Sequence, residues 1–449
     1  MKLSPLYTVC LLALIASILD TQAATASDWS RFRGPNGSGI STDTAPLPVT
    51  FGEKENLKWK FKLPGPGSSC PIVVGNDVFV TCWSGYGTSR QNPGNMSDLK
   101  RHLVCIDRRN GKERWSRAVD AVLPEDRFGG MFAEHGYATH TSVSDGERVY
   151  VFFGISGVVA FDLEGKQLWK KSVGTDLDRR RWGSSSSPIL YKKLLIVPAL
   201  VESQSMVAFD KLTGEVKWSK KAGGFGSTWG TPALVDVPGG RQELVIGVPE
   251  EIWGFNPDTG RFDWYCKGLE SDSVCTSVVV ADGIVYAIGG RSSSVAVRAG
   301  GKNDVEKSNL LWSGRAQSRI STPIFHDGRL YWIGSGIANC TDAKTGKSLA
   351  RVRLASGAAA PRNNDGGNAG GRRRFGGQDY SSPVAGDGKI FFVKRSGEVH
   401  VFKLDEKLEK LGANQIGGNG EDFSASPAIS NGELFVRSSR NLYCFGLDK

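Results

Sequence analysis

Short apolar runs separated by tight turns recur along most of the 449-residue chain. Each recurrence has a Ser/Thr-rich lead-in, an apolar run, a turn of the Asn-Gly or Asp-Gly kind and a second apolar run, as in "ISTPIFHDGRLYWIG" and "YSSPVAGDGKIFFVK". Runs of this length bounded by glycine turns are typical of β-hairpins. The pattern predicts eight hairpins, anchored at Pro71, Val143, Pro188, Pro232, Ser277, Pro323, Pro383 and Pro427.

Two further strands follow most hairpins, joined by turns such as "DKLTGE" and "NPDTGR". Four strands per unit agree with the recurring spacing of about 45 residues between anchors. A tryptophan commonly closes the fourth strand, where a large flat side chain can pack between neighbouring sheets. The tryptophans predicted to pack in this way are Trp59, Trp115, Trp169, Trp218, Trp264 and Trp312.

Eight four-stranded repeats without amphipathic helices predict an all-β, eight-bladed β-propeller, in which radial repetition leaves only short sheet edges. The last repeat stops after its third strand, "NLYCFGLDK", whereas a tryptophan-bearing strand, "NLKWKFKLPG", precedes the first repeat. We therefore expect this N-terminal strand to complete the last blade and to close the ring without a covalent link.

The chain before the propeller divides into two segments. Residues 1–26 combine Lys2, an apolar run and a small-residue "ATA" site, which is typical of a signal peptide. Residues 27–56 contain "SDWSRFRGPNGSGIST", which lacks the Gly-Lys-Ser/Thr ending of a phosphate loop. We expect this arm to pack on the base of the propeller through Trp29 and Phe32, away from any ligand. The propeller itself is predicted over residues 57–449.

The repeat "SSP-apolar-DG-apolar … AFDxxTGxxxW" resembles the pyrroloquinoline-quinone (PQQ) propeller repeat. Over the predicted mature chain, the layout is similar to exported bacterial propellers grouped with the outer-membrane assembly factor BamB. The opening "WSRFRGPNGSG" resembles the start of PQQ-like propeller proteins abundant in Planctomycetes. The resemblance implies a BamB-like propeller that binds protein in the cell envelope.

Charge and cysteine usage add little that is specific. The net charge of +10 favours anionic partners, and an evenly solvated basic surface explains it equally well. Three cysteines, Cys105, Cys340 and Cys444, occupy a strand position that other repeats fill with Ala or Gly, which predicts buried thiols. The hairpin register places Cys70 and Cys82 on opposite faces, while a disulfide between Cys266 and Cys275 stays open.

All long insertions fall on one face of the predicted ring, in residues 84–101, 117–138 and 355–378. Binding residues concentrate on loops carried by a rigid scaffold. Side chains expected on this elaborated face are His135, His140, Arg179, Arg180, Arg181, Trp182, Trp229, Glu250, Glu251, Arg291, Arg319, Arg372, Arg373, Arg374, Tyr380 and Arg395. The candidate ligand-binding residues at the channel mouth are His140, Trp182, Trp229, Glu250, Glu251, Arg291 and Arg319.

Two functions compete. The first is an exported, periplasmic or extracellular, non-catalytic scaffold that binds a protein, peptide or glycan on the elaborated face, with no cofactor, no metal, no transmembrane segment, no specific nucleic acid and a monomeric state. The second is a PQQ-dependent dehydrogenase or related oxidoreductase with the cofactor and calcium at the channel mouth. The resemblance to quinoproteins implies a platform containing adjacent cysteines, and the chain has no "CC". Trp229 and Glu250 are the residues that we expect to serve a quinone and its calcium.

Overall fold

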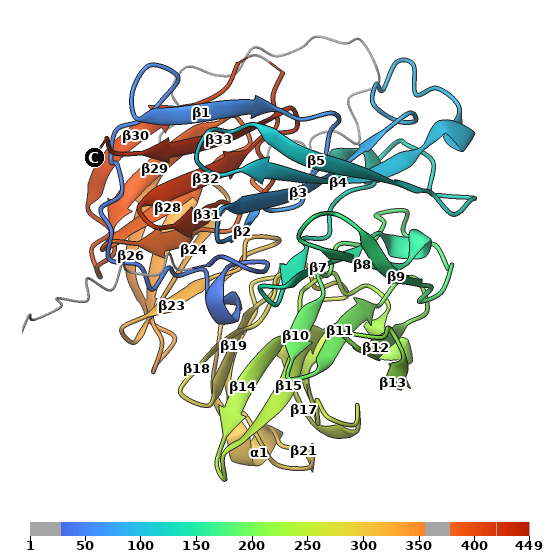
Figure 1. Cartoon of the computed structure of the whole chain (residues 1–449). Helices are drawn as coiled ribbons and strands as arrows, with labels where there is room; N and C mark the ends of the chain where they lie inside the picture. The colour runs from blue at the N-terminus through green and yellow to red at the C-terminus, as the bar shows by residue number, and fades with distance from the viewer. Residues whose placement is uncertain (1–27, 355–377, 419, 449) are drawn as a thin grey trace, which may run out of the picture.

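Eight antiparallel sheets surround a central channel in the computed structural model, which describes residues 28–354, 378–418 and 420–448 (Figure 1). The predicted all-β, eight-bladed propeller is therefore confirmed. The predicted signal peptide and the arginines at positions 372–374 lie outside the described residues. No helix in the described ranges is both long and apolar enough to cross a membrane.

The first four blades follow one another along the chain, each with its strands in sequence order. Blade 1 contains β2 (Ile72–Val74), β3 (Asp77–Ser84), β4 (Lys100–Asp107) and β5 (Glu113–Asp120). Blade 2 contains β6 (Val143–Ser144), β7 (Arg148–Phe152), β8 (Val158–Asp162) and β9 (Gln167–Lys171). Blade 3 contains β10 (Ile189–Tyr191), β11 (Leu194–Ala199), β12 (Ser205–Asp210) and β13 (Val216–Lys221). Blade 4 contains β14 (Ala233–Val237), β15 (Arg241–Val248), β16 (Glu250–Phe255) and β17 (Phe262–Leu269).

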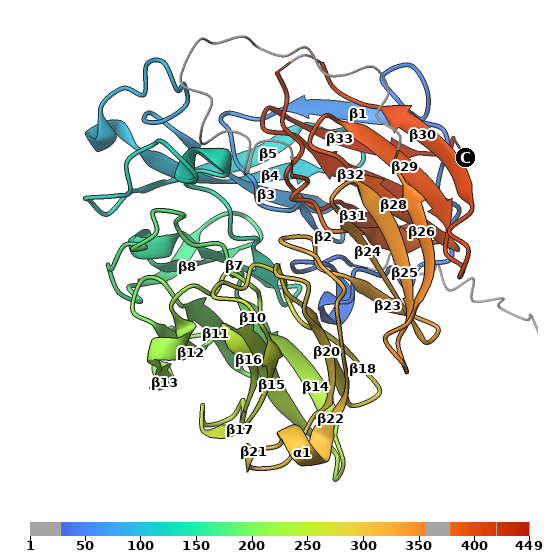
Figure 2. The ribbon, with the colours of Figure 1, turned by 180° about the vertical axis from the view of Figure 1, so that it is seen from behind.

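The remaining blades complete the ring (Figure 2). Blade 5 contains β18 (Val279–Ala281), β19 (Ile284–Ile288), β20 (Ser294–Arg298) and β22 (Leu310–Gly314). Blade 6 contains β23 (Ile324–His326), β24 (Arg329–Gly334), β25 (Ile337–Asp342) and β26 (Ser348–Arg353). Blade 7 contains β27 (Val384–Gly386), β28 (Lys389–Val393), β29 (Glu398–Lys403) and β30 (Lys410–Gln415). Blade 8 contains β31 (Ala428–Ser430), β32 (Glu433–Arg437), β33 (Asn441–Gly446) and β1 (Leu57–Lys62).

A few short elements lie outside this pattern. They are η1 (Pro35–Gly37), η2 (Met96–Asp98), η3 (Phe132–Glu134), η4 (Gly154–Ser156), η5 (Gly223–Phe225), β21 (Asn303–Asp304) and α1 (Glu306–Asn309). The strand β21 pairs in parallel with β17, so blade 4 gains a fifth strand from the chain of blade 5.

The ring closes between the two ends of the chain. Strand β1 pairs antiparallel with β33 and brings Trp59 opposite Cys444 (Figure 1). The N-terminal strand thus supplies the fourth strand of blade 8, as the sequence predicts.

Each closing tryptophan lies opposite a small residue of the third strand. Trp218 faces Ala208 and Trp264 faces Gly254, where an added Cβ would lie 2.1 Å from the indole. The same strand position holds the buried thiols Cys105 and Cys444. A large side chain here would displace the tryptophan, which explains the alternation of Ala, Gly and Cys.

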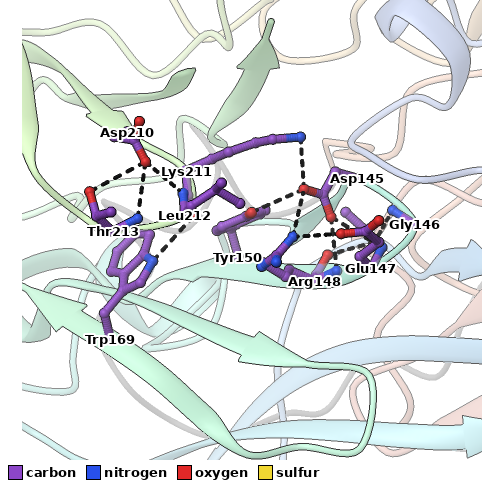
Figure 3. A network of polar contacts seen from close by, with 11 residues as sticks. Asp145, Gly146, Glu147, Arg148, Tyr150, Trp169, Asp210, Lys211, Leu212 and Thr213 are labelled. Carbon is purple, nitrogen blue, oxygen red and sulfur yellow. Dashed lines mark hydrogen bonds and ion pairs between the residues drawn. The ribbon is translucent and has the colours of Figure 1, made fainter. Parts of the chain in front are cut away.

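Five of the tryptophans bind the next blade. The Trp169 Nε1 group donates to the Lys211 carbonyl at 3.2 Å, and the Lys211 ammonium pairs with Asp145 at 2.9 Å (Figure 3). Trp59, Trp115, Trp218 and Trp312 make the same kind of bond to carbonyls of following blades. Trp264 instead donates to Glu243 of its own blade at 2.7 Å. These tryptophans therefore pack between or within blades and do not line the channel.

Blades 6 and 7 have Ala350 and Gly412 where other blades have tryptophan. The N-terminal arm covers part of this gap, because a Cβ on Gly412 would lie 3.1 Å from Val49. Phe51 packs on Phe445 of blade 8 with ring centroids 4.9 Å apart, and its backbone N–H donates to Asn414 of blade 7 at 3.0 Å. The arm thus acts as a wedge between these blades.

All seven described cysteines are free. The disulfide left open between Cys266 and Cys275 is therefore not formed. Cys266 is buried among the side chains of blades 4 and 5.

Candidate functional site

Eight side chains form a closed circle of hydrogen bonds around the channel. In each blade, the backbone N–H of the residue two positions before the first strand donates to the side chain of its counterpart in the next blade. The donor–acceptor distances are 3.0 Å (Cys70 to Thr141), 2.9 Å (Thr141 to Ser187), 3.0 Å (Ser187 to Thr231), 2.9 Å (Thr231 to Ser277), 2.9 Å (Ser277 to Thr322), 2.9 Å (Thr322 to Ser382), 2.8 Å (Ser382 to Ser426) and 3.2 Å (Ser426 to the Cys70 sulfur). The circle joins all eight blades.

The Ser/Thr-rich segments before the first strands are visible in the sequence, but their role as hydrogen-bond acceptors between neighbouring blades was not predicted. Two of the sequence anchors were wrong by one residue: the strand register aligns Ser142 and Val278, not Val143 and Ser277, with the prolines of other blades. With this correction, the residue before the anchor is Ser, Thr or Cys in all eight blades. That regularity was the available signal.

The N-terminal arm closes the channel at its base. Trp29 bridges to Val73 of blade 1, and the Ser144 N–H of blade 2 donates to the Ser30 carbonyl at 2.8 Å. The guanidinium of Arg33, almost fully buried, donates to the Thr322 carbonyl of blade 6 at 2.8 Å. Figure 1 shows this blue segment crossing the middle of the ring.

The expected packing of the arm on the base agrees with the structure, but its expected distance from any ligand site does not. Phe32 lines the central cavity and forms part of its floor. The chain folds back tightly here, because Gly34 has a φ of +64° and an added Cβ would lie 2.5 Å from the Trp29 indole. Trp29 is thereby buried in the base, whereas Phe32 faces the channel.

The cavity above this floor has a volume of about 150 Å³. Its lining is rich in hydroxyl groups, thiols and aromatic rings. The lining residues are Phe32, Ser68, Cys70, Met131, His135, Thr139, Thr141, Trp182, Ser185, Ser187, Trp229, Thr231, Cys275, Ser277, Arg319, Ile320, Thr322, Tyr380, Ser382, Ser424 and Ser426. Among these described residues, none is Asp, Glu, Asn or Gln.

Two tryptophans meet in this lining. The rings of Trp182 and Trp229 are 4.9 Å apart and inclined by 36°, within the range of attractive aromatic contact. The buried Trp229 donates its indole N–H to the Gly183 carbonyl at 2.7 Å, which fixes its orientation. The guanidinium of Arg180 lies 5.5 Å from the Trp182 ring centroid. Trp182 is only half-buried.

His135 supports this pair from behind. Its Nε2 atom donates to the Trp182 carbonyl, and its Nδ1 atom lies 2.8 Å from the Thr139 hydroxyl. Burial lowers the pKa of His135. The imidazole therefore acts as a neutral support rather than as a cation.

The seven predicted ligand-binding residues separate into four groups. Trp182, Trp229 and Arg319 line the central cavity. Arg291 lies on the rim, where Asp272 contacts it at 3.1 Å and contacts Arg180 at 3.8 Å. His140 lines a separate, smaller cavity.

Glu250 and Glu251 do not line either of these two cavities. They are the first residues of β16, where Glu250 has a φ of 68° and Glu251 accepts a bond from Trp253 at 2.6 Å. A ligand-binding role for these two residues stays a prediction.

The smaller cavity has a volume of about 30 Å³ and lies beside the channel mouth. The Ser184 hydroxyl donates to Oε1 of Glu202 and lies 2.9 Å from His140 Nε2. The other carboxyl oxygen of Glu202 and Nδ1 of His140 have no partner within the described residues. Burial raises the pKa of Glu202 to about 7 and lowers that of His140 to about 3.

Glu202 was missed in the sequence, where it stands alone in a loop of apolar and small residues, "ALVESQS". A cavity of this size has room for an ordered water. Since Ser184 follows the Trp182–Gly183 pair, the Glu202 carboxyl anchors the segment that carries the mouth tryptophan.

A protein-family model described as outer membrane protein assembly factor BamB matches residues 52–181 and 99–352. The two overlapping matches span more than half of the chain. The chain belongs to this family.

Similar proteins include members of two functional groups. The polyvinylalcohol dehydrogenase of Sphingopyxis sp. (strain 113P3) is 24% identical over 295 residues, covering 55% of this chain and only 40% of the relative. The structure of BamB from Moraxella catarrhalis matches with a TM-score of 0.59 and 11% identity over 87% of this chain and 99% of that one. Quinohemoprotein alcohol dehydrogenase from Comamonas testosteroni gives a TM-score of 0.61 and 12% identity over 94% and 81%. The structural matches show a common fold and nothing further.

The BamB-family channel of this chain does not fit a calcium-bound quinone. Calcium in proteins is held mainly by carboxylate, amide and backbone carbonyl oxygens. The described lining of the central cavity has no carboxylate or amide side chain, and Glu250, the expected ligand, is not part of it. Within the described ranges, no group of three or more His, Cys, Asp or Glu side chains is placed to hold a metal ion.

Proposed function

We propose that this BamB-family propeller is an exported, non-catalytic scaffold that binds an extended ligand at the open end of its channel. The ligand is a segment of an envelope or extracellular protein, a peptide or a glycan, and the protein works as a monomer in the periplasm or outside the cell. The observation that carries the proposal is the Trp182–Trp229 pair in a cavity that is closed at its base. The described lining of this cavity offers no carboxylate for acid–base chemistry.

Three features support this assignment. A one-ended cavity presents a single mouth, so a ligand approaches only from the elaborated face. Aromatic faces beside hydroxyl groups suit chains that combine flat apolar and polar parts. The family description, an assembly factor, is that of a protein that acts by binding other proteins.

The alternative is an oxidoreductase, which the similarity to polyvinylalcohol dehydrogenase favours. It requires a quinone and a base that the described channel lining does not supply. Addition of PQQ and Ca²⁺ to the purified full chain therefore tests it directly. Dye-linked oxidation of alcohols or polyvinyl alcohol that depends on both additions would overturn the scaffold proposal.

Site-specific photo-crosslinking tests the binding site. A photoreactive phenylalanine analogue at Trp182 should trap one reproducible ligand in producing cells, whereas the same group at Lys193, on an exposed turn of the opposite face, should not. Trp182→Ala should weaken capture about tenfold, because the lost stacking energy is on the order of 1 kcal/mol. Its melting temperature should remain close to that of the parent, since Trp182 is only half-buried. Equal crosslinking at both positions, or full affinity in Trp182→Ala, would contradict the proposal.

A further inference from the structure

A second, larger groove leads away from the channel mouth over the closure of the ring. Its volume is about 470 Å³, and it shares Ser68 and His135 with the central cavity. It follows the seam at which β1 joins blade 8, where the Leu63 N–H donates to the Arg440 carbonyl at 2.8 Å. The groove and the channel are therefore two parts of one continuous depression.

The walls of the groove come from different parts of the chain. The long loops after β3 and β5 contribute Arg90, Phe128 and Glu134, and blade 7 contributes Arg395. Trp83, at the end of β3, packs against Phe128 with ring centroids 6.2 Å apart. The groove is thus framed by the insertions that distinguish blade 1 from the other blades.

Two carboxylates in the groove are already neutralised. Glu134 contacts Arg90 at 2.8 Å and Arg395 at 2.9 Å, and Arg395 also pairs with Asp422. These contacts lower the pKa of Glu134 despite its partial burial, and they raise that of Arg395. The cluster is a fixed, balanced part of the wall.

Two cations remain without a counter-charge. Lys62, at the end of β1, and Arg440, before β33, both line the groove and are exposed. Neither forms an ion pair in the part of the chain that the structure describes. The groove therefore has an excess of two positive charges at the seam of the ring.

We propose that this groove binds an acidic segment of an extended peptide whose neighbouring residues enter the channel mouth. Lys62 and Arg440 pair with its side-chain carboxylates. The inference rests on the proposed scaffold function and names the chemistry of its ligand.

The charge pattern favours a peptide over a densely sulfated glycan. Two exposed cations match carboxylates that are spaced along a chain, whereas a continuous row of sulfates would need more cations than these two.

Fluorescence anisotropy with the purified full chain tests the inference. The probes are a labelled 12-residue peptide with Asp and Glu at alternate positions, its Asn/Gln counterpart, and a heparin oligosaccharide as competitor. The acidic peptide should bind at least tenfold more tightly than the neutral one. The double variant Lys62→Glu with Arg440→Glu should abolish this preference and fold normally, since both side chains are exposed. A matched double variant on the opposite face, Lys193→Glu with Lys344→Glu, should change the affinity less than twofold.

The outcomes separate the two proposals. Equal binding of both peptides, equal loss in the two double variants, or stronger binding of heparin through Lys62 and Arg440 would each overturn the acidic-peptide inference. A ligand trapped at Trp182 whose affinity is unchanged in the Lys62/Arg440 variant would overturn the inference and leave the scaffold function standing. Acidic-peptide binding that depends on Lys62 and Arg440 but not on Trp182 would support the groove as the peptide site. It would overturn the proposal that the ligand also binds at the channel mouth.

Discussion

Glu202 carries a carboxyl group that is 2% exposed and sits beside the channel mouth. Burial of a carboxylate disfavours its charged form, and the hydrogen bonds to the group, chiefly that from Ser184, do not compensate, so its pKa rises to about 7. The protonated form is therefore the preferred form of this side chain in weakly acidic solution. Since Ser184 belongs to the same segment as Trp182, the ionisation of Glu202 bears on the stability of the mouth.

The substitution Glu202→Gln should alter how stability depends on pH. A group whose folded pKa lies above its unfolded value of about 4.5 stabilises the fold fully below that value and loses this contribution as pH rises through about 7. Glu202→Gln should therefore gain stability relative to the parent between about pH 4.5 and 7, by at most about 3 kcal/mol. Urea unfolding at a series of pH values measures the difference.

Subtracting the parent curve removes the contribution of His140, whose pKa is lowered from 6.5 to about 3, so that it costs stability as pH falls through this interval in the parent and the variant alike. A difference curve that is flat between pH 4.5 and 7 would show that Glu202 is not titrating in this range.

At the scale of secondary-structure elements, the blades are joined at two radii. Near the axis, the circle of side-chain acceptors links each first strand to the next. Further out, tryptophans of the fourth strands donate to carbonyls of the following blade. Thr322 illustrates the inner circle, because its hydroxyl is the acceptor for the buried Ser277 N–H at 2.9 Å.

Substituting Thr322 separates this hydrogen bond from packing. Thr322→Val keeps the shape but leaves the Ser277 N–H without an acceptor, which should cost about 1 to 3 kcal/mol of unfolding free energy. Thr322→Ser retains the hydroxyl and should lose less, since only one methyl group is removed. Denaturant unfolding of both variants checks the order, and a serine variant as unstable as the valine variant would show that the methyl group, not the bond, matters.

Repetition explains which elements the sequence could predict. The blades, their turns and the strand exchange at closure recur or complement one another along the chain, so their prediction is confirmed by the sheet order. Glu202 and the Lys62–Arg440 pair occur once, and their environments depend on loops from distant blades. For Glu250 and Glu251, chain position predicts the face of the ring but not the distance from the axis, and neither residue lines the central cavity.

At the scale of the whole molecule, the N-terminal arm covers the channel at its base, so that the channel is open only at the elaborated face. The arm contacts blade 1 through Trp29, blade 6 through Arg33 and blade 7 through the Ser41 N–H, which donates to the Ala385 carbonyl at 2.8 Å. Since β1 follows the arm directly, closure of the ring and closure of its base depend on the same N-terminal segment.

Arg33 holds the arm to blade 6 by hydrogen bonds, and its substitution should release the arm without unfolding the blades. Arg33→Met removes the bonds to the Thr322, Pro323 and Ser38 carbonyls, while the strand pairing of β1 with β33 is untouched. Part of the cost is offset because a buried cation is removed as well, and burial already lowers the pKa of Arg33 to about 9. Local opening should therefore increase more than global unfolding does.

Limited proteolysis under native conditions, followed by mass spectrometry, measures this opening. Cleavage between residues 28 and 56 should become at least tenfold faster in Arg33→Met, while the melting temperature falls by only a few degrees. Lys54→Met, at the exposed end of the arm, provides the matched control and should be cleaved at the parental rate. If the arm of Arg33→Met were as resistant as that of the parent, the contacts of Trp29 and Phe51 would be sufficient to hold the base closed. If instead the whole propeller were digested, the arm and the ring would form a single cooperative unit.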